Sequence, residues 1–281
     1  TNIVLDLIFV GPMGMGVAGA AYATIISQII SAILCYLRML KMKDVLTLDI
    51  NAFKLDGKLS KQLIRLGLPV GITQALFAVA AIFVQNLTNT FGTVFIAAST
   101  VVMRVDGFAM LPNFTFGTAM TTYAGQNVGA MEIGRMRQGT KEGLKIGVTT
   151  SVVLVGLILI FGKILMGLFT NTDEVINVSY EMMCILSVGY IGVAINQILS
   201  GTIRGAGDTM TPMWIALVTT TLIRLPIAYG MAYFTRSETL PNGEPRSIYY
   251  SLVFAWVLGA IITAIIYKAG HWSKRARIGG K

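Results

Sequence analysis

Residues 66–103 read LGLPVGITQALFAVAAIFVQNLTNTFGTVFIAASTVVM, a stretch of 38 residues without one Asp, Glu, Lys or Arg. A helix needs about 20 apolar residues to cross the hydrocarbon core of a bilayer. Four further charge-free stretches of 21 to 31 residues lie at 7–37, 107–131, 182–203 and 247–267. One soluble domain cannot bury five such segments, and they lack the short alternating pattern of barrel strands. The sequence therefore predicts an all-α polytopic membrane protein.

Cutting the apolar runs of the whole chain at charges and at Gly, Pro and Asn predicts seven full transmembrane helices after a shorter apolar segment. The short segment, residues 1–10, would cover about 15 Å as a helix, which is half of a hydrocarbon core. We therefore expect it to be the end of a span in a longer protein, of which this chain is the C-terminal portion. The full spans are expected at residues 17–39, 63–87, 94–123, 144–168, 178–203, 212–234 and 247–268.

The placement of the basic residues predicts the orientation. The net charge is +9, and one set of alternate loops holds 17 of the 22 Lys and Arg residues, whereas the other set holds two. An excess of Lys and Arg in one set of loops marks those loops as cytoplasmic. We therefore interpret the positive charge as a signal of orientation in a lipid bilayer, not as a nucleic-acid-binding surface. We expect residues 1–41 to end an N-terminal lobe, 42–61 to be a cytoplasmic amphipathic linker, 62–270 to form a six-helix C-terminal lobe, and 271–281 to be a basic cytoplasmic tail.

Asp6 is the first candidate for chemistry, because it is the only carboxylate in the first forty residues and lies on an apolar segment. Asn2, four positions earlier, shares its helix face, and Thr24 in the next span can complete a polar cluster. A carboxylate near a helix end can simply be solvated by the connector. The functional interpretation is favoured, because ionisable residues at membrane depth usually mark ion or substrate pathways.

Other polar residues within the spans leave two interpretations open. Arg104 and Asp106 lie two positions apart, so they do not face each other and each needs another partner. Pro112 frees a backbone carbonyl and predicts a kink, which can line a transport pathway or be purely structural. The amides of the spans can bind substrate or join helices to each other, and they include Gln74, Asn196 and Gln197.

The sequence offers no enzymatic motif. It contains no HExxH, GxSxG or GxxxxGK[ST] pattern, and the single histidine, His271, is in the basic tail. We therefore expect no catalytic residues, no metal site, no organic cofactor and no ATP-driven pump.

Several strings, taken in order, resemble the MATE (multidrug and toxic compound extrusion) family. The resemblance runs from late in the family's fifth span through its twelfth and covers nearly the whole chain. It implies the C-terminal lobe of a twelve-helix exporter with two six-helix lobes, working by alternating access as an H⁺- or Na⁺-driven antiporter. The strings are NIVLD at 2–6, GVAGAAYAT at 16–24, LGLPVG at 66–71, GQNVGA at 125–130 and RGAGDT at 204–209, with Pro212 shortly after.

The resemblance also implies a site, a substrate class and a location. The family's proton-linked cluster falls on Asn2, Asp6 and Thr24, and the acidic residues of the sodium-linked branch in spans seven and ten have no counterpart here. H⁺ is therefore the expected coupling ion, with Na⁺ still open at the first site. The implied substrate is a small, often cationic organic compound, the implied partner is the N-terminal lobe of the same protein, and the implied location is the bacterial inner membrane. Alternatives are a lipid-linked oligosaccharide flippase and a non-transporting membrane scaffold.

Overall fold

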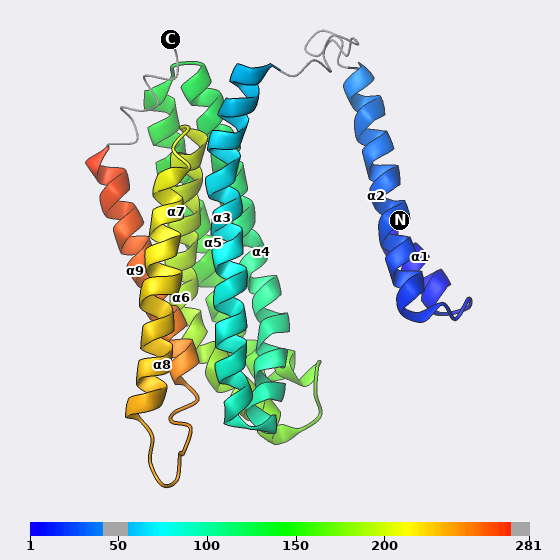
Figure 1. Ribbon diagram of the computed structural model, residues 1–281, viewed down its shortest axis with the longest axis vertical. Helices are drawn as coiled ribbons and strands as arrows, with labels where there is room; N and C mark the ends of the chain where they lie inside the picture. Colours follow the sequence, from blue (N-terminus) through cyan, green and yellow to red (C-terminus); the bar gives the residue numbers. More distant parts are fainter. Residues whose placement is uncertain (42–55, 271–281) are drawn as a thin grey trace. The chain divides into compact units, whose positions relative to one another are not determined.

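The computed structural model describes residues 1–41 and 56–270. The chain divides into two compact units, Thr1–Ser60 and Lys61–Lys281, which are drawn in Figure 1. Most of the linker expected at 42–61 and all of the tail expected at 271–281 lie outside the described residues. The domain boundaries expected from the sequence remain predictions.

The first unit is a helical hairpin. Helix α1 (Asn2–Val10) is the short apolar segment expected at the start of the chain, and α2 (Gly16–Lys41) is the first full span. The turn between them uses Gly14 and Gly16, which have φ angles of 61° and 55° that residues with a Cβ rarely adopt. The two helices touch at Gly19, where a Cβ would lie 3.0 Å from the Cβ of Phe9.

The second unit contains the other six spans. All seven expected spans are confirmed, because seven helices of the described residues are long and apolar enough to cross a membrane. The elements of this unit are α3 (Gly57–Thr88), η2 (Asn89–Phe91), α4 (Thr93–Gly129), α5 (Ile133–Gly167), α6 (Asp173–Gly205), α7 (Met210–Ala216), the π-helix η3 (Leu217–Ile223), α8 (Arg224–Phe234) and α9 (Ser247–Ala269).

Several helices extend beyond the expected apolar spans. Helix α5 begins at Ile133, eleven positions before the expected start at Leu144, and its first turns carry Arg135, Arg137 and Lys141. Hydropathy marks only the part of a helix that lies in hydrocarbon, whereas helical hydrogen bonding continues through charged turns at the membrane surface. The expected spans therefore underestimate the lengths of these helices.

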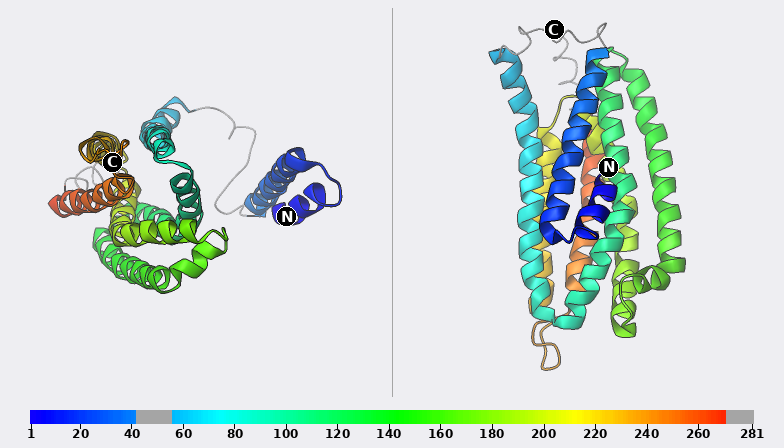
Figure 2. Two further views of the ribbon diagram at one scale, coloured as in Figure 1. Left: turned by 90° about the horizontal axis from the view of Figure 1, so that it is seen from below. Right: turned by 90° about the vertical axis from the view of Figure 1, so that its right-hand side faces the viewer.

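Helix α6 is the centre of the second unit, and the view in Figure 2 (left) shows α4, α5 and α9 around it. Small residues let the backbones of α4 and α6 approach closely. A Cβ on Gly201 would overlap the carbonyl oxygen of Gly117, and a Cβ on Gly205 would overlap the carbonyl oxygen of Thr121. Close approach through small residues is the usual basis of helix packing in a bilayer, where lipid tails compete with apolar side chains.

The span formed by α7, η3 and α8 departs from α-helical hydrogen bonding, and the kink expected at Pro112 of α4 stays a prediction. Helix α4 continues as one α-helix from Thr93 to Gly129 with Pro112 inside it. The span formed by α7, η3 and α8 instead contains seven residues of π-helix, Leu217–Ile223, immediately before Arg224. Pi-helical turns are rare and occur frequently at functional sites.

Candidate functional site

The polar residues predicted in the first unit do come together. The side-chain amide of Asn2 donates a hydrogen bond to the Thr24 hydroxyl oxygen, with an N···O distance of 3.4 Å. The same hydroxyl donates to the carbonyl oxygen of Ala20 in its own helix at 2.9 Å. The bond from Asn2 to Thr24 joins α1 to α2 on the face of α1 that also carries Asp6.

Asp6 is the unsatisfied member of this cluster. Its residue is partly buried, and its Oδ1 atom is buried without a hydrogen-bond partner among residues 1–41 and 56–270. The amide of Asn2, which the sequence placed within reach of Asp6, is directed instead to Thr24 on the neighbouring helix. A carboxylate oxygen without a donor is free to take a proton or a cation.

A second polar cluster lies in the core of the second unit and is centred on Asp106. The phenol of Tyr190 on α6 donates a hydrogen bond to Asp106 Oδ1 on α4, with an O···O distance of 2.6 Å. The Tyr190 side chain is only 2% exposed, and its hydroxyl also approaches the sulfur of Met183 at 3.8 Å. This short bond links the two central helices.

Two further helices contribute to the second cluster. Arg224, the first residue of α8, interacts electrostatically with Asp106, and its buried Nε has no hydrogen-bond partner among the described residues. Tyr249 on α9 interacts with both charges and donates its phenol proton to the Ser99 hydroxyl at 3.0 Å. The cluster thus carries one acid and one base within the apolar part of four helices.

The sequence did not reveal this second cluster as a unit. Asp106 and Arg104 have different partners, as their spacing predicted, but no pattern in the sequence connected Asp106 with Arg224, Tyr190 or Tyr249. The signal available in the sequence was an acid, Asp106, and a base, Arg224, each well inside an apolar span. Charged side chains at membrane depth need partners, but Arg104 and Lys163 also lie within spans, so the sequence does not single out Arg224 as the partner of Asp106.

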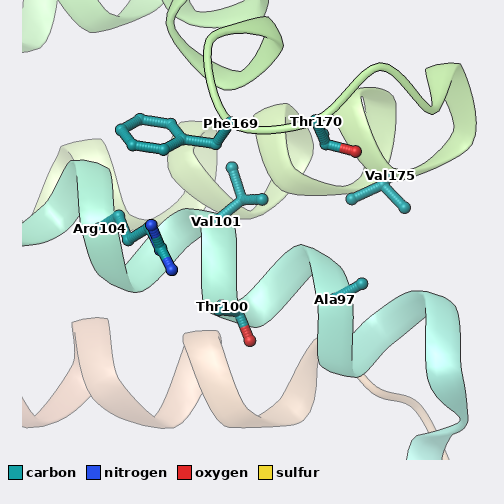
Figure 3. A pocket seen from close by; sticks show the side chains of 7 residues that line it. All are labelled: Ala97, Thr100, Val101, Arg104, Phe169, Thr170 and Val175. Atoms are coloured by element: carbon teal, nitrogen blue, oxygen red, sulfur yellow. The ribbon is translucent and has the colours of Figure 1, made fainter. Parts of the chain in front are cut away.

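Arg104 lies in a shallow hollow instead, which is shown in Figure 3. Its guanidinium carbon lies 5.9 Å from the centre of the Phe169 ring, a distance that allows a cation–π interaction. The hollow has a volume of about 290 Å³ between α4 and the segment that joins α5 to α6, and its lining consists of Ala97, Thr100, Val101, Arg104, Phe169, Thr170 and Val175.

The remaining candidate residues lie outside both clusters. Gln74 is exposed on α3, and Gln197 on α6 places its backbone carbonyl against Gly117. Asn196 accepts hydrogen bonds from the hydroxyls of Thr263 at 2.7 Å and Ser200 at 3.2 Å. The bond from Thr263 joins α9 to α6, which favours interhelical packing as the role of Asn196.

We expect Asn196→Ala to lower the thermal stability slightly and to leave transport per folded molecule unchanged. Thr263 keeps its bond to the Gly259 carbonyl at 2.7 Å, so the loss should be close to the average of about 0.6 kcal/mol for an interhelical side-chain bond in a membrane. Thermal melting and transport are measured on the same preparation, with the exposed loop variant Asn171→Ala as a control. Loss of transport at wild-type stability would identify Asn196 as a substrate contact instead.

The chain is similar to bacterial proteins described as multidrug resistance proteins. It is 28% identical over 260 residues to the probable multidrug resistance protein YoeA of Bacillus subtilis, covering 90% of this chain and 56% of the relative. It is 27% identical to the probable multidrug resistance protein NorM of Thermotoga maritima, covering 98% of this chain and 59% of the relative. The chain therefore spans less than two thirds of the length of these relatives.

Solved structures share the fold. A structure described as the outward-facing conformation of a multidrug resistance MATE family transporter superposes with a TM-score of 0.87 at 21% identity, covering 98% of this chain and 60% of that one. A structure described as the crystal structure of MATE in the straight conformation superposes with a TM-score of 0.86 at 22% identity, covering 98% of this chain and 61% of that one. The family model MatE matches residues 69–230, more than half of the chain. The chain is a multi-pass membrane protein that belongs to the MATE family.

Proposed function

We propose that the protein containing this chain is a proton-coupled antiporter that exports small, often cationic organic compounds by alternating access. The family and the names of the relatives support drug export. The observation that carries the coupling is Asp6, a partly buried carboxylate with an unpartnered oxygen beside the Asn2–Thr24 bond. The protein performs no chemical conversion in this proposal, and the ion gradient supplies the driving force.

An antiporter needs a group that responds differently to ion and drug. A ligand shifts a two-state equilibrium only if it binds the two states with different affinity. Protonation changes Asp6 from a negative acceptor into a neutral donor and acceptor. The ionised form attracts a cationic drug, whereas the protonated form does not, so a proton arriving from outside favours drug release there.

H⁺ is proposed over Na⁺ because the sodium-linked branch of the family relies on acidic residues in spans seven and ten. Residues 66–103 and 182–203 contain no Asp or Glu. A proton needs a single oxygen, which Asp6 Oδ1 offers. The proposed transporter also includes an N-terminal part equivalent to the remaining length of the relatives, which would complete the drug cavity.

The flippase alternative is less favoured by the charges in the core. Binding a lipid-linked pyrophosphate calls for uncompensated Arg or Lys side chains in the cavity. Arg224 interacts electrostatically with Asp106, and the guanidinium carbon of Arg104 lies 5.9 Å from the centre of the Phe169 ring.

The proposal is tested by transport in inside-out vesicles from cells that express the full transporter. Acidifying the vesicle lumen is expected to drive uptake of a fluorescent cationic dye, and a protonophore is expected to abolish this uptake. A sodium gradient without a pH gradient is expected to have no effect. Dye uptake that follows only the sodium gradient would overturn proton coupling, and uptake no faster than in vesicles without the protein would overturn drug export.

We also propose that the protein resides in the bacterial inner membrane with its C-terminus in the cytoplasm. In a variant whose native Cys35 and Cys184 are replaced by Ser, a cysteine at Asn171 should react with an impermeant thiol reagent in intact cells. A cysteine at Gln138 should react only after the cells are opened, because it lies among the basic residues that mark the cytoplasmic side. Both positions are exposed, so the opposite pattern would reverse the orientation.

A further inference from the structure

One end of the second unit carries a basic hollow that the proposed export mechanism does not use. The hollow has a volume of about 280 Å³, and it is lined by Arg137 near the start of α5 and by Tyr267, Lys268 and Gly270 at the end of α9. Both helix ends lie at the upper end of this unit in Figure 1. The hollow therefore brings together two cations that are more than a hundred positions apart in the sequence.

The two cations stand on a packed base. Met136, the residue before Arg137, is fully buried, and Tyr267, the residue before Lys268, packs against the buried cluster that includes Met136. These contacts hold the backbones of α5 and α9 in place, whereas the side chains of Arg137 and Lys268 are exposed. Long basic side chains lay their apolar stems along such a surface and keep their charges in the polar layer of the membrane.

The positive charges of the hollow are not neutralised by acidic side chains in the described part of the chain. Neither Arg137 nor Lys268 takes part in an ion pair among residues 1–41 and 56–270, and neither does Glu132 at the N-cap of α5. Glu142 pairs with Lys145 at 2.9 Å instead. The first turn of α5 contains no acidic residue, and the N-terminal end of a helix itself favours an anion. The ligand that suits this hollow is therefore negatively charged.

An exposed apolar strip leads away from the hollow along α9. Ile265 and Ile261 precede Lys268 by three and seven positions, so the three side chains share one face of the helix. The two isoleucines are 63% and 50% exposed. A ligand that contacts both the cations and this strip must combine an anionic group with hydrocarbon.

We propose that the hollow binds the phosphate group of an anionic phospholipid between Arg137 and Lys268. An acyl chain of the same lipid lies along Ile265 and Ile261. Arg donates to phosphate oxygens through its planar fork, and Lys binds them as a point charge. Basic pockets between transmembrane helices are suited to anionic lipid headgroups. The bound lipid joins the ends of α5 and α9, which both pack against α6.

The test is lipid retention by the full transporter, purified in detergent and titrated with dioleoylphosphatidylglycerol or with dioleoylphosphatidylcholine. Native mass spectrometry counts the lipid molecules that stay bound to the protein. The wild type is expected to retain phosphatidylglycerol at lower lipid concentration than phosphatidylcholine. A basic residue beside an anionic lipid surface contributes about five-fold to binding, so Arg137→Gln and Lys268→Gln should each weaken retention of phosphatidylglycerol by about this factor, and the double variant by about 25-fold.

Matched variants separate the hollow from general surface charge. Arg135→Gln combined with Lys141→Gln removes two charges from exposed positions of α5 that do not line the hollow, and it should retain phosphatidylglycerol as the wild type does. Arg137→Lys combined with Lys268→Arg keeps both charges and should also retain the lipid. Asp6→Asn should bind lipid normally even where it abolishes export, so failure of the proposed coupling and failure of this site are distinguishable.

Inorganic phosphate in large excess distinguishes a lipid site from a site for the free anion. It should leave phosphatidylglycerol bound, because it has no hydrocarbon to contact the apolar strip. Displacement of the lipid by inorganic phosphate would overturn the proposal in favour of a free-anion site. Equal retention of the two lipids by the wild type would also overturn it, as would an equal loss of phosphatidylglycerol in the two double Gln variants.

Discussion

Replacing Asp6 with Asn is expected to abolish proton-driven drug export while the protein remains folded and inserted. Asn has nearly the shape of Asp but cannot gain or lose a proton, so it holds the site in a form that resembles the protonated state. Asp6 Oδ1 has no hydrogen-bond partner in the described part of the chain, so the substitution breaks no bond at this atom. The transporter would keep its architecture and lose the group that distinguishes its two states.

The measurement is dye uptake into acidified inside-out vesicles, normalised to the amount of folded protein. Uptake by Asp6→Asn should fall to the level of vesicles without the transporter, whereas the exposed control Asp173→Asn should keep the wild-type rate. Adding drug to purified wild-type protein should also release protons, and Asp6→Asn should release none. Export at the wild-type rate by Asp6→Asn would show that coupling lies elsewhere.

The sequence predicted the number of spans because the physical requirement is local. A span is a run of about 20 mostly apolar residues, and the apolar runs of the chain, cut at their punctuation, gave seven helices. The π-helix at Leu217–Ile223 was not predicted, since its apolar and threonine residues would suit an α-helix equally well. Its hydrogen-bond register depends on tertiary packing, which hydropathy does not contain.

The two polar clusters differ in how far the sequence could define them. Asn2, Asp6 and Thr24 lie on adjacent helices joined by a short connector, so their proximity follows from a hairpin, and the structure joins Asn2 to Thr24. Asp106 and Arg224 are on helices that are not consecutive, and their proximity depends on the arrangement of the whole second unit. The sequence identified both charges but not their relation.

Gly201→Ala is expected to cause a large loss of stability, because it adds a methyl group where α4 and α6 are in backbone contact. A Cβ at this position would overlap the carbonyl oxygen of Gly117 and lie 3.1 Å and 3.3 Å from the carbonyl carbon and Cα of the same residue. All three atoms belong to the backbone of α4, so no side chain can rotate away. The two central helices must separate instead.

Separating α4 from α6 also disturbs the contacts that depend on their distance. Overpacking of a well-packed interior typically costs about 1–3 kcal/mol. The upper part of this range is expected here, because the backbone contact at Gly205 lies one turn further along α6 and loses its fit as well. The bond between Tyr190 and Asp106 spans the same pair of helices and should weaken.

The thermal midpoint of the detergent-solubilised protein measures the effect, and Gly156→Ala on α5 is the matched control. A Cβ at Gly156 would meet no atom within 4 Å apart from its own helix, and Ala is a better helix former than Gly by about 1 kcal/mol. Gly156→Ala should therefore melt at or above the wild-type temperature, and Gly201→Ala well below it. Equal melting temperatures for Gly201→Ala and the wild type would contradict the backbone contact between Gly201 and Gly117. The close packing of α4 against α6 would then not be as the structure has it.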